Sequence, residues 1–154
     1  MGYDVYGNDP VINEMRPVIL DKPFNEITEE ERDEYFEAER NHEKVNPGIY
    51  FRNNVWFWRP LWNFVCEVCQ DFLSQKDMDK GCGNHGEIIS KTKAKKIAKK
   101  LFQCHQDGVI EEYGKMYRVT QKKAGEYAKM YPFSEENVVD FAKFAEQSGG
   151  FQIC

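Results

Sequence analysis

The side chains best suited to chemistry in this sequence gather in residues 50–62, where aromatic rings are mixed with arginine and asparagine. If residues 49–58 are extended, alternation places Phe51, Val55 and Phe57 on one face of the strand. The other face can stack on a planar ligand and pair with an anionic group. It presents Tyr50, Arg52, Asn54, Trp56 and Trp58, with Arg59 directly after them.

The same segment also has a purely structural interpretation, which the sequence leaves open. Arg52 and Asn54 would then satisfy buried backbone groups or a carboxylate such as Asp4, while the tryptophans pack inside the protein. Both interpretations make the segment indispensable, but only the first gives it a ligand.

A second candidate is the loop of residues 81–87, which has glycine at three of its first six positions. Glycine lets a backbone turn sharply and approach a ligand closely. Asn84 and His85 are candidate ligand-binding residues there, and an imidazole beside Glu87 could perform acid–base chemistry. The loop lacks the dinucleotide fingerprint, the phosphate-loop pattern and any nucleophile motif, so an ordinary connector is the alternative.

A metal site must be considered, because Cys66-x2-Cys69 followed by Cys82-x2-His85 resembles the spacing of a zinc finger. A structural zinc usually takes its first pair of ligands from a turn, whereas Cys66 and Cys69 lie in a strongly apolar stretch of helical periodicity. That context favours buried free thiols. We therefore predict neither a metal nor another cofactor.

Composition bounds the class of protein. The chain has 154 residues, enough for one domain with a substantial core. Its net charge of −5 argues against binding to nucleic acid, since binding to that polyanion needs a positive field. No window approaches a membrane span, and five cysteines with no basic or apolar leader predict a soluble protein with free thiols in a reducing cytoplasm.

The charge is distributed unevenly. Residues 22–44 carry nine acidic against four basic residues, which predicts an acidic surface. A later run holds six lysines and no acid: Lys91, Lys93, Lys95, Lys96, Lys99 and Lys100. These lysines form a solvated helix face, pair with the acidic helix of residues 29–43, or contact an anionic partner, and the sequence does not choose among the three.

A mainly α-helical fold, α+β at most, must position these residues. The apolar positions of residues 60–73 cover most of a helix circumference, which predicts a central helix. Thr28 and Glu31 match a capping box, so a surface helix should begin at about residue 29 and end near 41. We also expect helices at 90–105, 109–130 and 134–147, a short strand at 3–6, an extended connector around 18–20 and a polar loop at 74–89.

Four motifs are spread over the start, middle and end of the chain: DVYG at residues 4–7, YFRNNVWFWRPLW at 50–62, YPFS at 131–134 followed by ENV at 136–138, and SGGFQIC at 148–154. Together they resemble a family of small uncharacterised proteins from bacteria and bacteriophages. The resemblance implies an accessory protein of phage or prophage type that acts in the bacterial cytoplasm. Relative to that family, residues 14–46 look like an insertion, and Cys82 and His85 stand where relatives more often have other residues.

We therefore expect a non-enzymatic binding protein that uses residues 52–62 to hold a small planar or phosphorylated ligand, or a host protein. A small hydrolase with His85, Glu87 and Asp4 as acid–base groups and Arg52 gripping an anion is the enzymatic alternative. A third alternative is an inhibitor of a host protein, with the acidic insertion as a mimic of a polyanion. A ligand binder or an enzyme needs Arg52, Asn54 and His85 to converge on one concave pocket, whereas an inhibitor needs an exposed patch.

Overall fold

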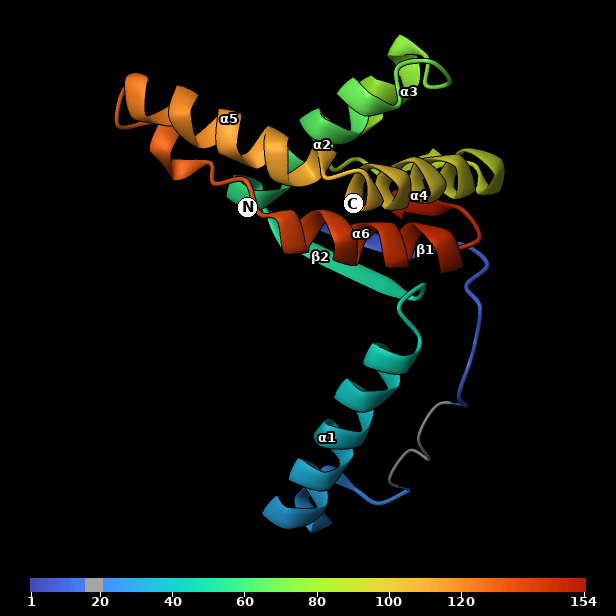
Figure 1. Ribbon diagram of the computed structural model, residues 1–154. Helices are drawn as coiled ribbons and strands as arrows, with labels where there is room; N and C mark the ends of the chain where they lie inside the picture. Colours follow the sequence, from blue (N-terminus) through green and yellow to red (C-terminus); the bar gives the residue numbers. More distant parts are fainter. Residues whose placement is uncertain (16–20) are drawn as a thin grey trace.

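A computed structural model describes residues 1–15 and 21–154, and within these ranges it contains six α-helices and one four-stranded antiparallel sheet (Figure 1). The helices are α1 Glu29–Val45, α2 Val55–Val68, α3 Gln75–Lys80, α4 Lys91–Gln106, α5 Val109–Lys123 and α6 Glu135–Gln147. The strands are β1 Gly2–Gly7, β2 Tyr50–Asn54, β3 Glu87–Ile89 and β4 Phe151–Ile153, in the order β2-β1-β4-β3. The expected mainly α fold is confirmed, whereas the connector around residues 18–20 lies outside the described residues.

The sheet joins the two ends of the chain. β1 pairs with β2 on one side and with the C-terminal β4 on the other, and two backbone hydrogen bonds of 2.8 Å link Asp4 with Cys154. Tyr3 and Val5 of β1 are buried, whereas Tyr6 of the same strand, whose side chain is on the other face of the sheet, is exposed. Helices therefore cover one face of the sheet, and the other face is open to solvent.

Residues 74–89, expected as a loop, contain a short helix and a strand. The Ser74 hydroxyl accepts a hydrogen bond from the Asp77 N–H, and the Asp77 carboxylate accepts one from the Ser74 N–H, so a capping box starts α3. Glu87–Ile89 becomes β3 by pairing with β4. Strands of three residues carry too little alternation to be predicted from sequence.

The strand expected over residues 49–58 ends at Asn54, and the rest of that prediction is wrong. The Asn54 side chain accepts a hydrogen bond of 3.1 Å from the Phe57 N–H and caps α2 at this point. The helix therefore begins at Val55, and Pro60 lies inside it rather than in its first turn. It ends at Val68, five residues before the predicted end, although Leu73 beyond it is buried.

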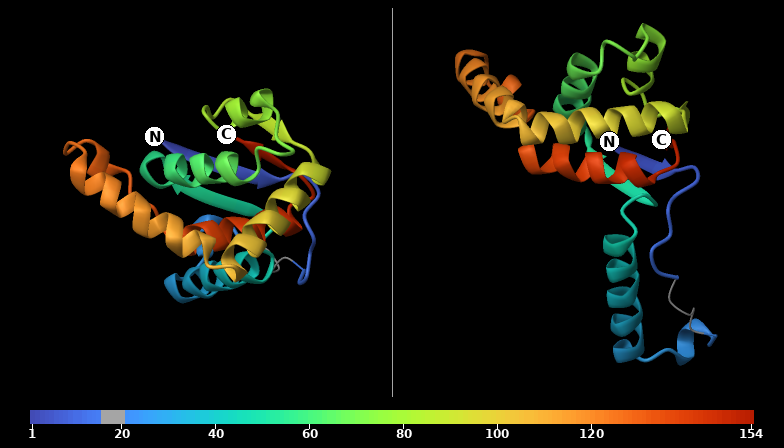
Figure 2. Two further views of the ribbon diagram at one scale, coloured as in Figure 1. Left: turned by 45° about the horizontal axis from the view of Figure 1, so that its top comes forward. Right: turned by 45° about the vertical axis from the view of Figure 1, so that its right-hand side comes forward.

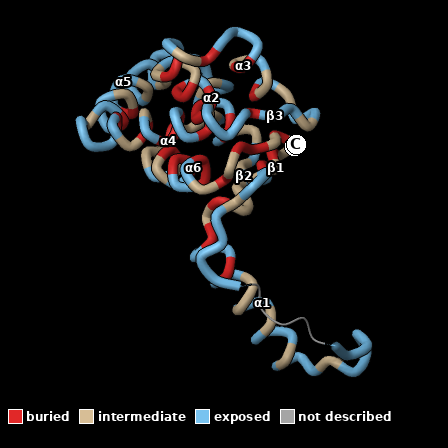
Figure 3. Tube along the Cα trace, turned by 90° about the vertical axis from the view of Figure 1, so that its right-hand side faces the viewer, coloured by how far each residue is buried: buried red, intermediate tan, exposed pale blue. Residues whose placement is uncertain are grey.

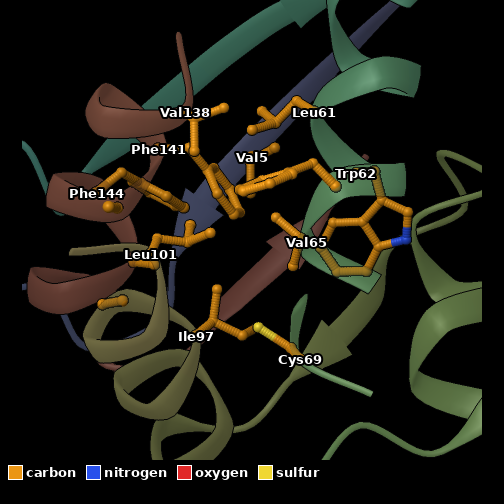
Figure 4. Packing of buried hydrophobic residues seen from close by; sticks show 14 of the residues in the cluster. Val5, Leu61, Trp62, Val65, Cys69, Ile97, Leu101, Val138, Phe141 and Phe144 are labelled. Atoms are coloured by element: carbon orange, nitrogen blue, oxygen red, sulfur yellow. The ribbon is translucent and has the colours of Figure 1, made fainter. Parts of the chain in front are cut away.

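α2 is the centre of the core, as its apolar circumference predicted. The indoles of Trp58 and Trp62 stack with ring centroids 5.5 Å apart, and Tyr3 stacks on the other side of Trp58 at 5.0 Å. Figure 4 shows residues of α2, α4 and α6 meeting over β1. This packing includes Val5, Leu61, Trp62, Val65, Cys69, Ile97, Leu101, Val138, Phe141 and Phe144 (Figure 4).

α4 and α6 lie side by side on this core (Figure 2), and α5 extends from the end of α4. The helix expected over residues 109–130 stops at Lys123, because Ala124 is extended and Gly125 follows it. A short 3-10 helix, Ala128–Met130, then turns the chain back toward α6. No helix in the described part of the chain has the length and apolar character needed to cross a membrane.

α1 stands clear of the rest of the molecule as an arm (Figure 3). Its predicted capping box is confirmed, since Thr28 and Glu31 exchange side chain to backbone hydrogen bonds. The helix continues to Val45, beyond the expected end. Asn46 holds its base: the buried amide accepts a hydrogen bond of 2.6 Å from the Asn13 N–H and donates one of 2.8 Å to the His42 carbonyl.

Candidate functional site

The strand part of the predicted polar-aromatic face lies on β2. Tyr50 and Arg52 point away from the core, while Phe51 between them packs against Phe141 with ring centroids 5.2 Å apart. The Tyr50 hydroxyl donates a hydrogen bond to the Asp4 carboxylate, and Arg52 Nε lies 3.6 Å from Asp4 Oδ1. Burial, reinforced by the bond to Asp4, raises the pKa of Tyr50 to about 12. Asp4 thus engages both candidates, as the structural interpretation of this segment anticipated.

The helical part of the segment departs from the predicted face. Trp58 is fully buried between Tyr3 and Trp62, and its indole N–H donates a hydrogen bond of 2.8 Å to the Gly81 carbonyl. Its assignment to a ligand-binding face is wrong, because the helix turns this side chain into the core. Trp56 is half-buried, and its ring packs edge-on against Tyr131 at 4.9 Å.

Arg59 leads to a different site, a cleft between α2 and α5 that we call the tyrosine cleft. Its volume is about 350 Å³. It is lined by Arg59, Pro60, Asn63, Tyr117, Thr120, Gln121, Ala124, Tyr127, Ala128 and Tyr131. Three phenol rings and one guanidinium therefore converge in one concave space.

Hydrogen bonds fix the wall of this cleft. The Tyr117 hydroxyl donates to the Tyr131 carbonyl at 2.7 Å. The Gln121 amide donates to the same carbonyl at 2.6 Å and to the Ala128 carbonyl at 2.8 Å. These bonds tie the 3-10 turn to α5, so the cleft is formed before any ligand arrives.

The charge of the cleft comes from Arg59. Its guanidinium lies 5.6 Å from the centre of the Tyr131 ring, and its Nη1 donates to the Tyr131 hydroxyl at 3.1 Å. That hydroxyl also shares a hydrogen bond of 2.9 Å with Tyr127, which together with burial raises the pKa of Tyr131. No carboxylate among the described residues lies within ion-pair distance of Arg59, so its charge is open to an anion.

The glycine loop forms a separate, smaller hollow. His85 and Glu87 line a space of about 200 Å³ together with Lys76, Asp79, Lys80 and Gly83. Asn84 lies outside this hollow and donates a hydrogen bond of 3.4 Å to the Gly2 carbonyl. β2 and β3 form opposite edges of the sheet, so Arg52 and Glu87 lie about 14 Å apart at the usual strand spacing. The acid–base pair and the anion clamp of the hydrolase alternative therefore do not share a site.

The cysteines do not assemble around a metal. In residues 1–15 and 21–154, no three His, Cys, Asp or Glu side chains form a group that could hold an ion. Burial raises the pKa of Cys66 and of Cys69 to about 12, which disfavours the thiolates that zinc requires. Cys66 lies in α2 and Cys69 directly follows its last residue, whereas Cys82 is exposed and belongs to the glycine loop.

Most of the tyrosine cleft was missed by sequence reasoning. The sequence predicts one continuous helix over residues 109–130, which would include both Tyr117 and Tyr127. The usable signal was Gly125, because glycine is a poor helix former and the helix ends directly before it, at the extended Ala124. Only Arg59 was among the predicted site residues that line this cleft.

Comparison with known proteins adds no guide to the activity. No family model, curated protein sequence or solved structure matches the chain. The function must therefore be argued from the geometry, in which a mainly α fold with a small open-faced sheet carries a preformed aromatic cleft.

Proposed function

We propose that this protein is a non-enzymatic binding protein that holds a small planar ligand with an anionic group in the tyrosine cleft. The observation that carries the proposal is Arg59, whose guanidinium lies over Tyr131 in the wall of a preformed cleft. The proposal keeps the class of function expected from the sequence, but it moves the centre from Arg52 to Arg59.

The dimensions of the cleft suit a small molecule. Its volume of about 350 Å³ lies at the lower end of the range for small-molecule sites, which runs from about 300 to 1,000 Å³. Tyr117, Tyr127 and Tyr131 supply ring surface for a planar group, and Arg59 supplies a charge-assisted hydrogen bond to an anion. One ring system with a carboxylate or phosphate fits this combination.

The lining also favours binding over catalysis. No histidine or carboxylate is found among the described residues that line the tyrosine cleft. The phenols there hydrogen-bond to carbonyls, to each other and to Arg59, and the pKa of Tyr117 is raised by burial. Neither a general base nor an activated nucleophile is therefore at hand.

Ligand-observed NMR with two defined probes, benzoate and adenosine monophosphate, tests the proposal. We expect saturation transfer from the protein to at least one probe, and its loss in Arg59→Ala. Arg52→Ala is the matched control, because it removes another exposed arginine that lies outside the cleft. Loss of the signal in both variants, or in neither, would place binding elsewhere, and no transfer to either probe would count against this ligand class.

A further inference from the structure

The arm helix α1 has a strongly acidic solvent face. The helix contains eight acidic and three basic residues. Glu30, Asp33, Glu34 and Glu37 are exposed and follow the spacing that puts side chains on one helix face. None of the four forms an ion pair with another described residue. The buried His42 lies on a different side of the helix, so the acidic face does not hold the arm in place.

The helix α4 has the opposite character. It carries six lysines and no acidic residue. Lys91 pairs with Asp9 and Lys93 with Asp77, but the other four lysines have no carboxylate partner in the described part of the chain. Three of these, Lys95, Lys96 and Lys99, are exposed along one line of the helix, which we call the lysine ridge.

The lysine ridge is flanked by two grooves with apolar walls. One groove, of about 860 Å³, lies toward α6 and includes Ala98 and Phe102. The other, of about 450 Å³, includes Phe72, whose ring lies 5.8 Å from Lys96 Nζ. A helix laid along the ridge would therefore meet both positive charge and apolar surface.

Within one chain the two faces cannot meet, although pairing of these helices was one of the possibilities left open by the sequence. α1 points away from the helices that cover the sheet, and α4 lies among those helices (Figure 1). Each face therefore keeps a surplus of like charge, which repels itself along its own helix.

We propose that the acidic face of α1 docks on the lysine ridge of a second copy of this chain. The two helices have nearly equal length, 17 and 16 residues, and opposite charge at matching spacing: 30, 33, 34 and 37 against 95, 96 and 99. Phe36, which is 51% exposed, borders the acidic face and would meet the apolar wall of a groove. The contact makes no use of the tyrosine cleft.

A second copy suits these surfaces better than another occupant. Both faces belong to the same chain, so every copy supplies one arm and one ridge in equal number. Nucleic acid would be attracted by the ridge, but the arm and the net charge of −5 would repel it.

Sedimentation velocity of the full chain tests the docking. We expect self-association at low salt and dissociation to monomers at high salt, because exposed charges are screened. A wild-type chain that stays monomeric at low salt would overturn the proposal. The acidic face of α1 would then be a surface for a different, basic protein.

Charge reversal makes the test specific to these helices. We expect the arm variant Glu30→Lys, Glu34→Lys, Glu37→Lys and the ridge variant Lys95→Glu, Lys96→Glu, Lys99→Glu each to be monomeric. Mixing the two variants should restore the complex, because each reversed face then meets its opposite. Failure of the mixture to associate, with both variants folded by circular dichroism, would overturn the proposal.

A matched control separates the ridge from a general effect of charge. Three exposed lysines of α5 can be reversed together without touching either face: Lys115→Glu, Lys122→Glu, Lys123→Glu. This variant should associate like the wild type. Its loss of association would show that net charge, rather than the lysine ridge, controls assembly.

Discussion

The backbone of Gly81 lies directly against the indole of Trp62: a Cβ built on Gly81 would stand 2.0 Å from Trp62 Cε2. The carbonyl of the same glycine accepts a hydrogen bond from the Trp58 indole at 2.8 Å. The glycine loop is thus clamped to the two stacked tryptophans of α2, and its first glycine is needed for close packing rather than for ligand contact.

Gly81→Ala should accordingly lower the free energy of unfolding by about 2–3 kcal/mol, since the new methyl group would displace a buried ring. Gly125→Ala is the control, because nothing lies within 4 Å of a Cβ at that position. We expect that change to stay within about 0.5 kcal/mol. Denaturant melts of the two variants compare them directly, and equal effects would contradict the close packing of Gly81 on Trp62.

This clamp illustrates what the sequence could predict and what it could not. The central helix and the capping box at Thr28 follow from local patterns, and both exist. The boundary at Asn54 was misplaced because the residues after it, Val55 to Trp58, have high β propensity, and tertiary packing overrode that preference. A single asparagine cap inside such a run gives too weak a local signal to mark the change from strand to helix.

The candidate site was harder to predict, because its parts meet only in the folded chain. Arg59 and Tyr131 are 72 residues apart in sequence, yet they form one hydrogen bond. No periodicity links such residues, and three-residue strands such as β4 likewise exist only through their partners. Residue types suggested an aromatic and cationic site, but the topology decided which arginine belongs to it.

Arg52→Ala should have little effect on stability. The side chain is 69% exposed and its ion pair with Asp4 is long at 3.6 Å, a kind of contact worth about 0–1 kcal/mol. The neighbouring Phe51→Ala should cost more, about 2–3 kcal/mol, because it removes a ring packed on Phe141 and Phe144. Thermal or denaturant melts of the two variants check the assignment of the two faces of β2. A larger loss of stability in Arg52→Ala than in Phe51→Ala would contradict it.

Asp77 gives the stability a dependence on pH. This buried carboxylate lies 2.6 Å from Lys93 Nζ and 3.2 Å from Lys80 Nζ. Burial alone would raise the pKa of Asp77, but hydrogen bonds from Lys93, Ser74 and Lys80 together hold it far below its ordinary value. Its ionised form is therefore favoured in the folded state.

Asp77→Asn should then lower the free energy of unfolding by about 1.5–3 kcal/mol at neutral pH. Because the folded-state pKa is depressed, the stabilisation is complete above the unfolded-state pKa of about 3.9 and is lost as pH falls below it. The difference in free energy of unfolding between wild type and variant should thus become smaller below about pH 4. Denaturant melts at several pH values measure it, with exposed Asp71→Asn as control. A gap that is constant with pH would exclude the charge as its cause.

Cys82 should react faster with iodoacetamide than Cys66, Cys69 or Cys104 in the folded protein. It is exposed, whereas burial raises the pKa of Cys66 and Cys69 to about 12 and also raises that of Cys104. At pH 8 a thiol with a pKa of about 12 is ionised to only about one part in ten thousand. Peptide mass spectrometry after timed labelling measures the relative rates of the cysteines. In denatured protein the differences between these rates should disappear. Comparable labelling of Cys66 in the folded state would contradict its burial.

Asn46 controls the arm, and its removal should loosen α1 while leaving the core intact. The side chain is 1% exposed, and its amide bonds to backbone groups of Asn13, Glu14 and His42. In Asn46→Ala these backbone groups lose their partner, at a cost of about 1–3 kcal/mol. Because 1.4 kcal/mol corresponds to a factor of ten, amides of α1 should exchange with deuterium about tenfold faster.

Hydrogen exchange read by mass spectrometry resolves this effect along the chain. Amides of α2 and α4 should keep their wild-type rates, because α1 stands clear of the core that protects them (Figure 3). Asn41→Ala, on the exposed surface of α1, is the matched control and should change little. High salt keeps any docking of the arm on a second copy screened during the measurement. Faster exchange throughout the molecule would show that the arm and the core unfold as one unit, and the description of α1 as a separate element would then be wrong.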